Sequence, residues 1–141
     1  MKIMSVDLGL SRTGIAVCDP LEMLASPVKV IFEKYEPKLI EQIVLEAKNQ
    51  NAELIVVGLP LNMDGSKGER AQECERIAEI IEEKSGVNVQ MWDERCTTVM
   101  SHNALNVTNV RGQKRKNVVD AVAAVMILES YLEYRKNKRP L

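Results

Sequence analysis

The sequence predicts an α/β fold in which a mixed five-stranded sheet carries helices on both faces. Three short apolar stretches follow one another in the first 32 residues with only turns between them, as in an antiparallel meander. Helical stretches then alternate with single strands, which is typical of parallel β-α-β units. The 141 residues are expected to form one domain, 1–141, which is long enough to bury a core without disulfides or a structural metal.

The meander accounts for the first three predicted strands. Residues 2–7 and 14–18 are apolar and flank a turn bounded by Gly9 and Gly14. A third strand is predicted at Val28–Phe32, directly after Pro27. Short connections of this kind favour antiparallel neighbours.

Two helices and one strand are predicted in the middle of the chain. Pro37 is typical of a first helical turn, and apolar residues at helical spacing continue the pattern to about Asn51. Residues 53–58 are almost continuously apolar, like a strand that is buried on both faces. Ser66 and Glu69 have the spacing of a capping box, so the next helix is expected to begin there.

The last third of the chain is predicted to hold one strand and two helices. Val87–Trp92 alternates as a fifth strand does. Thr97 or Thr98 is expected to cap a short helix through Leu105, and a final helix is predicted at about 117–134. From Arg111 onward the chain carries a net charge of +5, against −6 for the rest. This basic end is either a surface that faces phosphates or an ordinary solvated surface.

Acidic residues interrupt the apolar pattern at three places. Asp7 ends the first strand, Asp93 and Glu94 follow the fifth, and Asp120 lies in the most apolar helix. Each has an ordinary explanation, respectively a turn former, a polar helix entry and a complement to the helix dipole. Helical spacing nevertheless places Asp120 on the same face as Ala124, toward the sheet.

Taken together, these acids predict a metal site. Strand ends and a helix start can meet at one edge of a sheet, and carboxylates that meet there repel unless a proton or a cation joins them. Oxygen donors without His or Cys favour Mg²⁺ or Mn²⁺. Two such ions, roughly 3.5–4 Å apart, would form a phosphodiester-cleaving site.

Several cations are expected near this site. Arg12, Arg70 and Arg95 each follow one of its elements, and Lys67 lies in a loop with two glycines that let the backbone approach a phosphate. Ordinary loop chemistry explains that loop equally well.

Other function classes find little support in the sequence. The three cysteines form no CxxC pair, which argues against zinc and is typical of small buried residues in a reducing cytosol. Gly9 and Gly14 have P-loop spacing, but Ile15 stands where the lysine belongs. No apolar run is long enough for a membrane span, and no signal peptide is recognised.

Four motifs, DLGLSRTGIAVCD, VVGLPLNMDGSKGERA, DERCTT and VVDAVAAVMILESYL, together resemble the YqgF family over nearly the whole chain. Its members are described as Holliday junction resolvases or pre-16S rRNA nucleases. The resemblance implies a ribonuclease H-like fold and a bacterial, cytoplasmic, metal-dependent hydrolase. The implied role is maturation of the 5′ end of precursor 16S rRNA, on the ribosomal small subunit, with resolution of branched DNA as the alternative.

The resemblance also implies roles for single residues. The catalytic acids would be Asp7, Glu94 and Asp120, with Glu94 favoured over Asp93 for the place beside the metal. Asn117 stands where a related resolvase family has a second acid, so it would ligate through its amide oxygen without adding charge. The candidates for nucleic-acid binding come from the charge pattern rather than from the resemblance, and they are Arg12, Lys67, Arg70, Arg95, Arg111, Lys114, Arg115 and Lys116.

Two alternatives stay open. A non-catalytic RNA-binding factor with the same fold would have no reason to retain repelling carboxylates, and this distinguishes it from a nuclease. The protein is either a monomer, suited to one cut at one RNA end, or a homodimer, suited to a symmetric junction.

Overall fold

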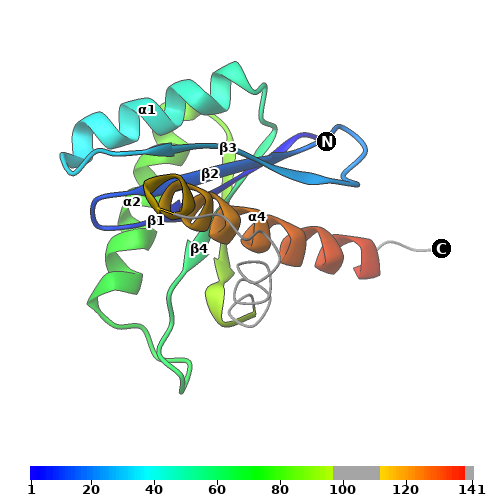
Figure 1. The fold of residues 1–141 in the computed structure, drawn as a ribbon. Coiled ribbons are helices and arrows are strands. Elements are labelled where there is room, and N and C mark those ends of the chain that lie inside the picture. The colour runs from blue at the N-terminus through cyan, green and yellow to red at the C-terminus, as the bar shows by residue number, and fades with distance from the viewer. Residues whose placement is uncertain (97–111, 139–141) are drawn as a thin grey trace.

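A computed structural model describes the backbone of residues 1–96 and 112–138, and the side chains of 1–95 and 122–137. Five strands form one sheet in the order β3-β2-β1-β4-β5 (Figure 1). β1 is antiparallel to β2 and parallel to β4, while β2 is antiparallel to β3 and β4 is parallel to β5. The strands are β1 Ile3–Leu8, β2 Thr13–Cys18, β3 Ala25–Ile31, β4 Leu54–Leu59 and β5 Asn88–Asp93.

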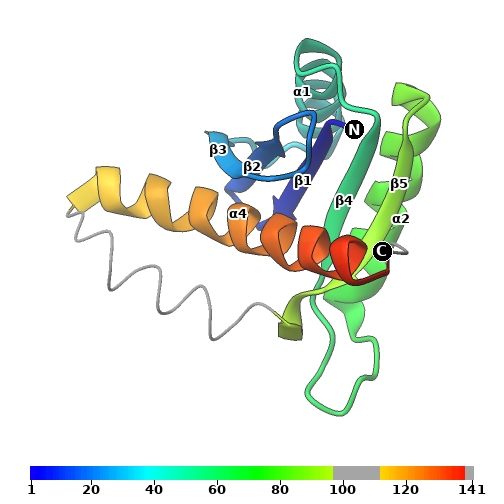
Figure 2. The ribbon, with the colours of Figure 1, turned by 90° about the vertical axis from the view of Figure 1, so that its right-hand side faces the viewer.

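The helices cover both faces of the sheet (Figure 2). α1 (Glu36–Asn49) and α2 (Glu69–Ser85) lie on one face, and the long α4 (Gly112–Lys138) crosses the other. A short 3₁₀ turn, η1 (Glu94–Cys96), follows β5. This mixed sheet, with a meander, parallel strands and helices on both faces, confirms the predicted fold class.

Each face of the sheet has its own apolar layer. Alternate side chains of β1 point to opposite faces, so Met4 and Val6 pack with Ile43 of α1, whereas Ile3 packs with Ile127 of α4. All five side chains are 1% exposed or less. β4 is buried along its whole length, as the apolar run predicted.

One polar contact ties α4 to the sheet. The buried Ser5 hydroxyl, on the α4 face of β1, donates a hydrogen bond to the Ala124 carbonyl at 2.7 Å. A bond of this kind contributes roughly 1 kcal/mol, and it also sets where α4 crosses β1. The position of the whole helix relative to the strand that carries Asp7 is therefore fixed.

The third strand begins earlier than predicted. It starts at Ala25 and includes Pro27, which was expected to precede it. Proline is tolerated here because β3 is an edge strand, and its pairing with β2 is already irregular where Ala16 lies opposite Pro27.

The predicted capping box at Ser66 is wrong. α2 begins at Glu69 after Gly68, and no side chain caps it. The Ser66 hydroxyl instead donates to Asp64 Oδ1 at 2.6 Å and accepts from the Asn62 amide at 2.9 Å. Ser66 thus stabilises the loop instead of capping the helix, and short hydroxyl side chains commonly do either.

The final helix is longer than predicted. α4 begins at Gly112, five residues before Asn117, because Gln, Lys and Arg are good helix formers. Asp120 is therefore two turns inside the helix, and the interpretation that it complements the helix dipole at the start is wrong. The short helix expected from Thr97 or Thr98 to Leu105 lies outside the described residues. Among those described, no helix is long and apolar enough to cross a membrane.

The topology brings four strand ends to one edge of the sheet, called here the catalytic edge after the acids whose catalytic role the resemblance implies. β1, β4 and β5 run parallel, and β3 runs in the same direction because it pairs with the antiparallel β2. The residues that follow β1, β3, β4 and β5 therefore all emerge at the catalytic edge. This is where the acids were expected to meet.

Candidate active site

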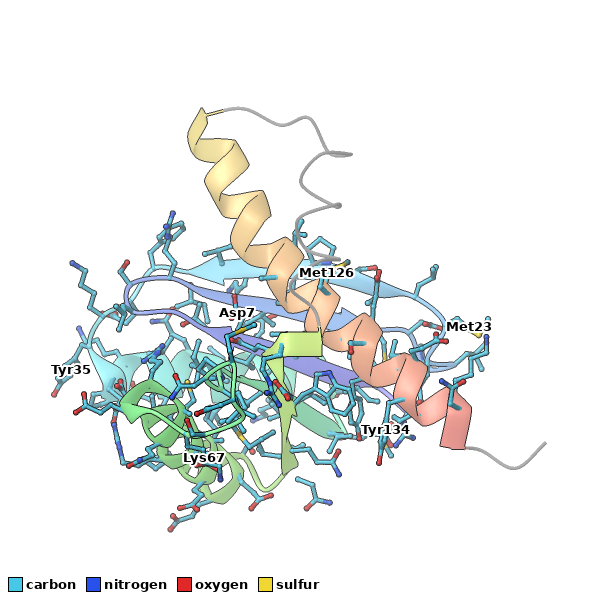
Figure 3. All side chains as sticks on the ribbon, turned by 90° about the horizontal axis from the view of Figure 1, so that it is seen from below. Asp7, Met23, Tyr35, Lys67, Met126 and Tyr134 are labelled. Carbon is cyan, nitrogen blue, oxygen red and sulfur yellow. The ribbon has the colours of Figure 1, made fainter. Side chains whose placement is uncertain are left out.

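Two of the predicted acids meet at the catalytic edge. Asp7 is the fifth residue of β1, and Glu94 follows β5 directly. The Glu94 carboxyl hydrogen-bonds the Asp7 carboxyl, although 86 residues separate them in the chain. Figure 3 shows Asp7 near the middle of the molecule, below α4. Both side chains are half-buried.

The pair shares a proton in the absence of a cation. Burial, then the negative charge of Asp7 and then the hydrogen bond to it raise the pKa of Glu94 to about 8, while Arg70 partly opposes the shift. Glu94 is thus the donor in the pair at neutral pH. Two half-buried carboxyls that keep a proton between them have the electrostatics of a cation site.

Asp93 does not join this pair. Arg95 donates from Nε to Asp93 Oδ1 at 3.1 Å and from Nη2 to Oδ2 at 2.7 Å, and its backbone N–H donates to Oδ1 at 2.9 Å. These bonds lower the pKa of Asp93. Asp93 is thus held by Arg95, whereas Glu94 faces Asp7.

Arg70 is a cation whose charge acts on the acidic pair. From the first turn of α2 its Nη2 donates to the Leu8 carbonyl at 2.7 Å, and its Nη1 forms an ion pair with Glu73 at 3.1 Å. Its charge lowers the pKa of Glu94 and also opposes the raised pKa of Cys74, a buried thiol whose pKa desolvation raises to about 11. Arg70 therefore joins the end of β1 to α2 beside the acids.

The other predicted cations lie on the loops and turns around the site. Lys67 forms an ion pair with Glu75 at 2.8 Å. Besides holding Asp93, Arg95 donates to the Met63 carbonyl at 3.2 Å and so supports the loop that follows β4. Arg12 lies in the turn between β1 and β2, next to Thr13.

Several predicted site residues fall outside the described side chains. Asp120 belongs to α4, four residues before the Ala124 that Ser5 contacts, but its side chain is not described. The same holds for Asn117, Lys114, Arg115 and Lys116, whereas Arg111 lies outside the described residues altogether. Among the described side chains, no three Asp, Glu, His or Cys groups gather closely enough to hold a metal ion.

Gly58, which the sequence analysis missed, makes room for Glu94. It is the fifth residue of β4, and a Cβ there would come within 2.9 Å of Glu94 Cγ and 2.8 Å of Ile127 Cδ1. Contacts this short essentially never occur, so any larger residue at this position would force Glu94 or Ile127 to shift. The signal in the sequence was a glycine inside an apolar strand, which often marks a close approach.

The fold is ribonuclease H-like. It is similar to T. thermophilus RuvC in complex with a Holliday junction substrate, with a TM-score of 0.65 and 13% identity over all of both chains. It is also similar to the fowlpox virus resolvase bound to Holliday junction DNA, with a TM-score of 0.61 and 12% identity over 96% of this chain and 99% of that one.

The family model described as "RuvX: Holliday junction resolvase" matches residues 1–134. A Lachnospira eligens protein named "Putative pre-16S rRNA nuclease" is 41% identical, over 96% of this chain and 99% of its own length. One from Desulfitobacterium hafniense with the same name is 39% identical, over 98% and 96%. The chain belongs to the RuvX family, also called YqgF, and is a nuclease; the resemblance found in the sequence is confirmed.

Proposed function

We propose that this nuclease is a divalent-metal-dependent endonuclease that cuts precursor 16S rRNA at the 5′ end of the mature sequence. The observation that carries the proposal is the pair formed by Asp7 and Glu94 at the catalytic edge. The names of the relatives with 41% and 39% identity support the choice of substrate.

The donors at this edge fit Mg²⁺ or Mn²⁺. They are carboxyl oxygens, the donors that these ions prefer, and they share a proton that a cation would replace. Asp7 and Glu94 would hold the metal, joined by Asp120 and by the amide oxygen of Asn117. When bound, the metal would supply a polarised water and stabilise charge on the leaving oxygen.

The remaining residues of the edge have supporting tasks. Arg95 holds Asp93 away from Glu94, so the acid that faces Asp7 is fixed. Gly58 leaves space for the Glu94 side chain, and Ser5 fixes α4, on which Asp120 lies. Arg70 adds positive charge beside the acids, which favours the approach of a phosphate.

Three variants test the assignment. Asp7→Asn and Glu94→Gln should each abolish Mn²⁺-dependent cleavage of a precursor 16S rRNA fragment, because each removes a charged ligand. Asp93→Asn is the matched control, since it changes the adjacent acid, which Arg95 holds; it should keep most of the activity. Full cleavage by Asp7→Asn, or equal losses in all three variants, would contradict the proposal.

Resolution of branched DNA is the second candidate, favoured by the family description and by the likeness to two resolvases. The purified protein should be given the precursor rRNA fragment and a synthetic four-way junction side by side, with Mg²⁺, with Mn²⁺ and with chelator. We expect faster cleavage of the RNA. Cleavage of the junction alone would favour the second candidate, and binding without any cleavage would favour the RNA-binding factor.

A further inference from the structure

Phe32, the one phenylalanine of the chain, is 56% exposed at the catalytic edge. It follows the last residue of β3, Ile31, which is buried against the α1 side of the sheet. A single exposed aromatic residue is ordinary on a protein surface. Its meaning depends on which face of the sheet it shares and with which residues.

The strand register, extended by one position past the end of β3, puts Phe32 on the same face as Asp7. Asp7 lies opposite Gly14 in β2, and Gly14 lies opposite Val30 in β3. Side chains of directly opposed residues point to the same face, and positions two apart along a strand do so as well. Continued alternation past Val30 therefore directs Phe32 to the α4 face, where Asp7 also points.

The two residues are near neighbours in this geometry. Phe32 is two strands and two residues away from Asp7, which corresponds to roughly 12 Å between their Cα atoms. Gly14 lies opposite Asp7 on the strand between β1 and β3, and it has no side chain that could stand between Asp7 and Phe32.

Arg12 lies on the same part of this face. Because Thr13 is opposite Ile31, continuing the β2–β3 ladder by one residue brings Arg12 opposite Phe32. A guanidinium group and an aromatic ring side by side are the two elements with which proteins hold single-stranded nucleic acid, one for the phosphate and one for the base.

We propose that Phe32 is a stacking platform for an unpaired base of the substrate, with Arg12 on the adjoining phosphate. This inference rests on the proposed nuclease function and adds a substrate requirement: the strand that enters from the β3 side is single-stranded next to the cut. A base has a π-face whatever its identity, so stacking here recognises single-strandedness rather than sequence.

The chain offers a matched control in Tyr35. This aromatic side chain is 61% exposed and only three residues away. Its backbone carbonyl accepts from the Leu39 N–H at the start of α1, which packs on the opposite face of the sheet. Figure 3 shows Tyr35 on the α1 side, away from Asp7.

The experiment measures binding without cleavage. A short single-stranded RNA that carries 2-aminopurine is titrated with wild type, Phe32→Ala, Phe32→Tyr and Tyr35→Ala in the presence of chelator. Phe32→Ala should weaken binding by roughly 5- to 150-fold, as the loss of one base stack does, and should lose the fluorescence quench. Phe32→Tyr should restore both, and Tyr35→Ala should match wild type.

A fully paired RNA duplex of the same length serves as the second ligand, and Phe32→Ala should bind it as wild type does. Single-strand binding by Phe32→Ala within two-fold of wild type would overturn the proposal, and so would an equal loss in Tyr35→Ala. Since no metal is present, this result is independent of whether Asp7→Asn abolishes cleavage, and the two proposals can fail separately.

Discussion

Glu94 donates a hydrogen bond to Asp7 across the catalytic edge, which joins the residue after the fifth strand to the end of the first. Metal-free stability should therefore depend on pH in a definite direction. The pKa of Glu94 is about 8 in the folded protein and has its ordinary value of 4.5 when unfolded. Between these values the folded state binds more protons, so the free energy of unfolding falls as pH rises from about 4.5 to 8.

The measurement is thermal unfolding in chelator at several pH values. The melting temperature should fall across this window, by roughly 3–5 °C for each kcal/mol of stability that disappears in a chain of this size. Glu94→Gln removes the titrating group and should flatten that part of the curve, and saturating Mn²⁺ should do the same in wild type. A wild-type curve as flat as that of Glu94→Gln would show that the two carboxyls do not share a proton.

A second prediction concerns Gly58. Gly58→Ala forces Glu94 and Ile127 to move, because the new Cβ would meet Ile127 Cδ1 at 2.8 Å. Overpacking of this kind lowers the free energy of unfolding by roughly 1–3 kcal/mol. It should also displace the Glu94 carboxyl, so the cleavage rate should fall even at a temperature where the variant is fully folded. Gly68→Ala is the control, since its Cβ would meet only Asn62 at 3.7 Å. Equal activity in the two variants would refute the close approach.

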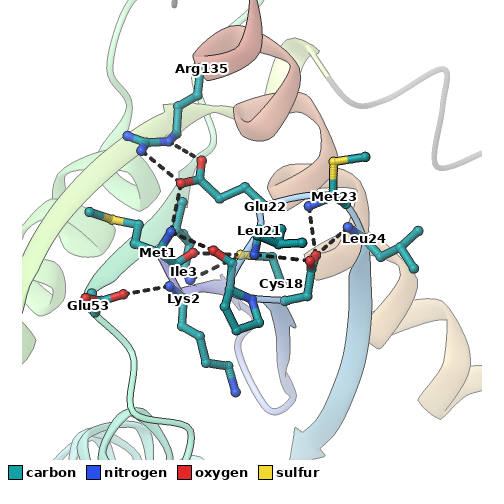
Figure 4. A network of polar contacts seen from close by, with 12 residues as sticks. Met1, Lys2, Ile3, Cys18, Leu21, Glu22, Met23, Leu24, Glu53 and Arg135 are labelled. Carbon is teal, nitrogen blue, oxygen red and sulfur yellow. Dashed lines mark hydrogen bonds and ion pairs between the residues drawn. The ribbon is translucent and has the colours of Figure 1, made fainter.

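A third prediction concerns Glu22, far from the site in the loop between β2 and β3. Its side chain is 6% exposed and accepts from Arg135 Nε at 2.7 Å and from the Met1 ammonium at 3.0 Å (Figure 4). The hydrogen bond from Arg135, followed by that from Met1, lowers the pKa of Glu22 to about 2. The stabilisation is therefore present above pH 4.5 and is lost as pH falls through about 2.

Glu22→Gln should lower the free energy of unfolding by roughly 1–3 kcal/mol at neutral pH, as removal of a charged partner does. It should also reduce the amount of stability that is lost when the pH is lowered. Glu36→Gln is the comparison, because Glu36 pairs with Arg76 at 2.7 Å on an exposed surface and such pairs contribute about 0–1 kcal/mol. Denaturant unfolding at pH 7 and pH 3 measures both. A larger effect at Glu36 than at Glu22 would contradict the ranking.

A fourth prediction comes from the sequence alone. Neutralising Lys114, Arg115 and Lys116 together should weaken nucleic-acid binding and flatten its dependence on salt, by up to about one unit of slope for each phosphate that the protein no longer neutralises. Binding is measured at several salt concentrations with an RNA fragment. An unaltered slope would mean that these charges face solvent only.

Much of the fold was accessible from the sequence because periodicity reports burial. The apolar run at β4 and the helical stripe of α2 predicted their elements within a few residues. The errors arose where tertiary context decides. Pro27 is accepted only because β3 became an edge strand, and Ser66 found partners inside its own loop.

The candidate site shows the same division. The apolar pattern identified Asp7 and the pair Asp93–Glu94 as acids in an apolar context. The pattern alone does not say which of the two adjacent acids faces Asp7. The distinction depends on Arg95, which binds Asp93 through contacts that no periodicity encodes. Gly58 escaped for a similar reason, since its role depends on Ile127 of a distant helix.

The position of β5 has a consequence for when the enzyme is active. Within the described sheet this strand pairs with β4 alone, at the border, yet the residue that follows it completes the acidic pair. If the proposed function holds, fraying of that border would separate Glu94 from Asp7 while most of the sheet stays intact, so cleavage would depend on the pairing of β5 with β4.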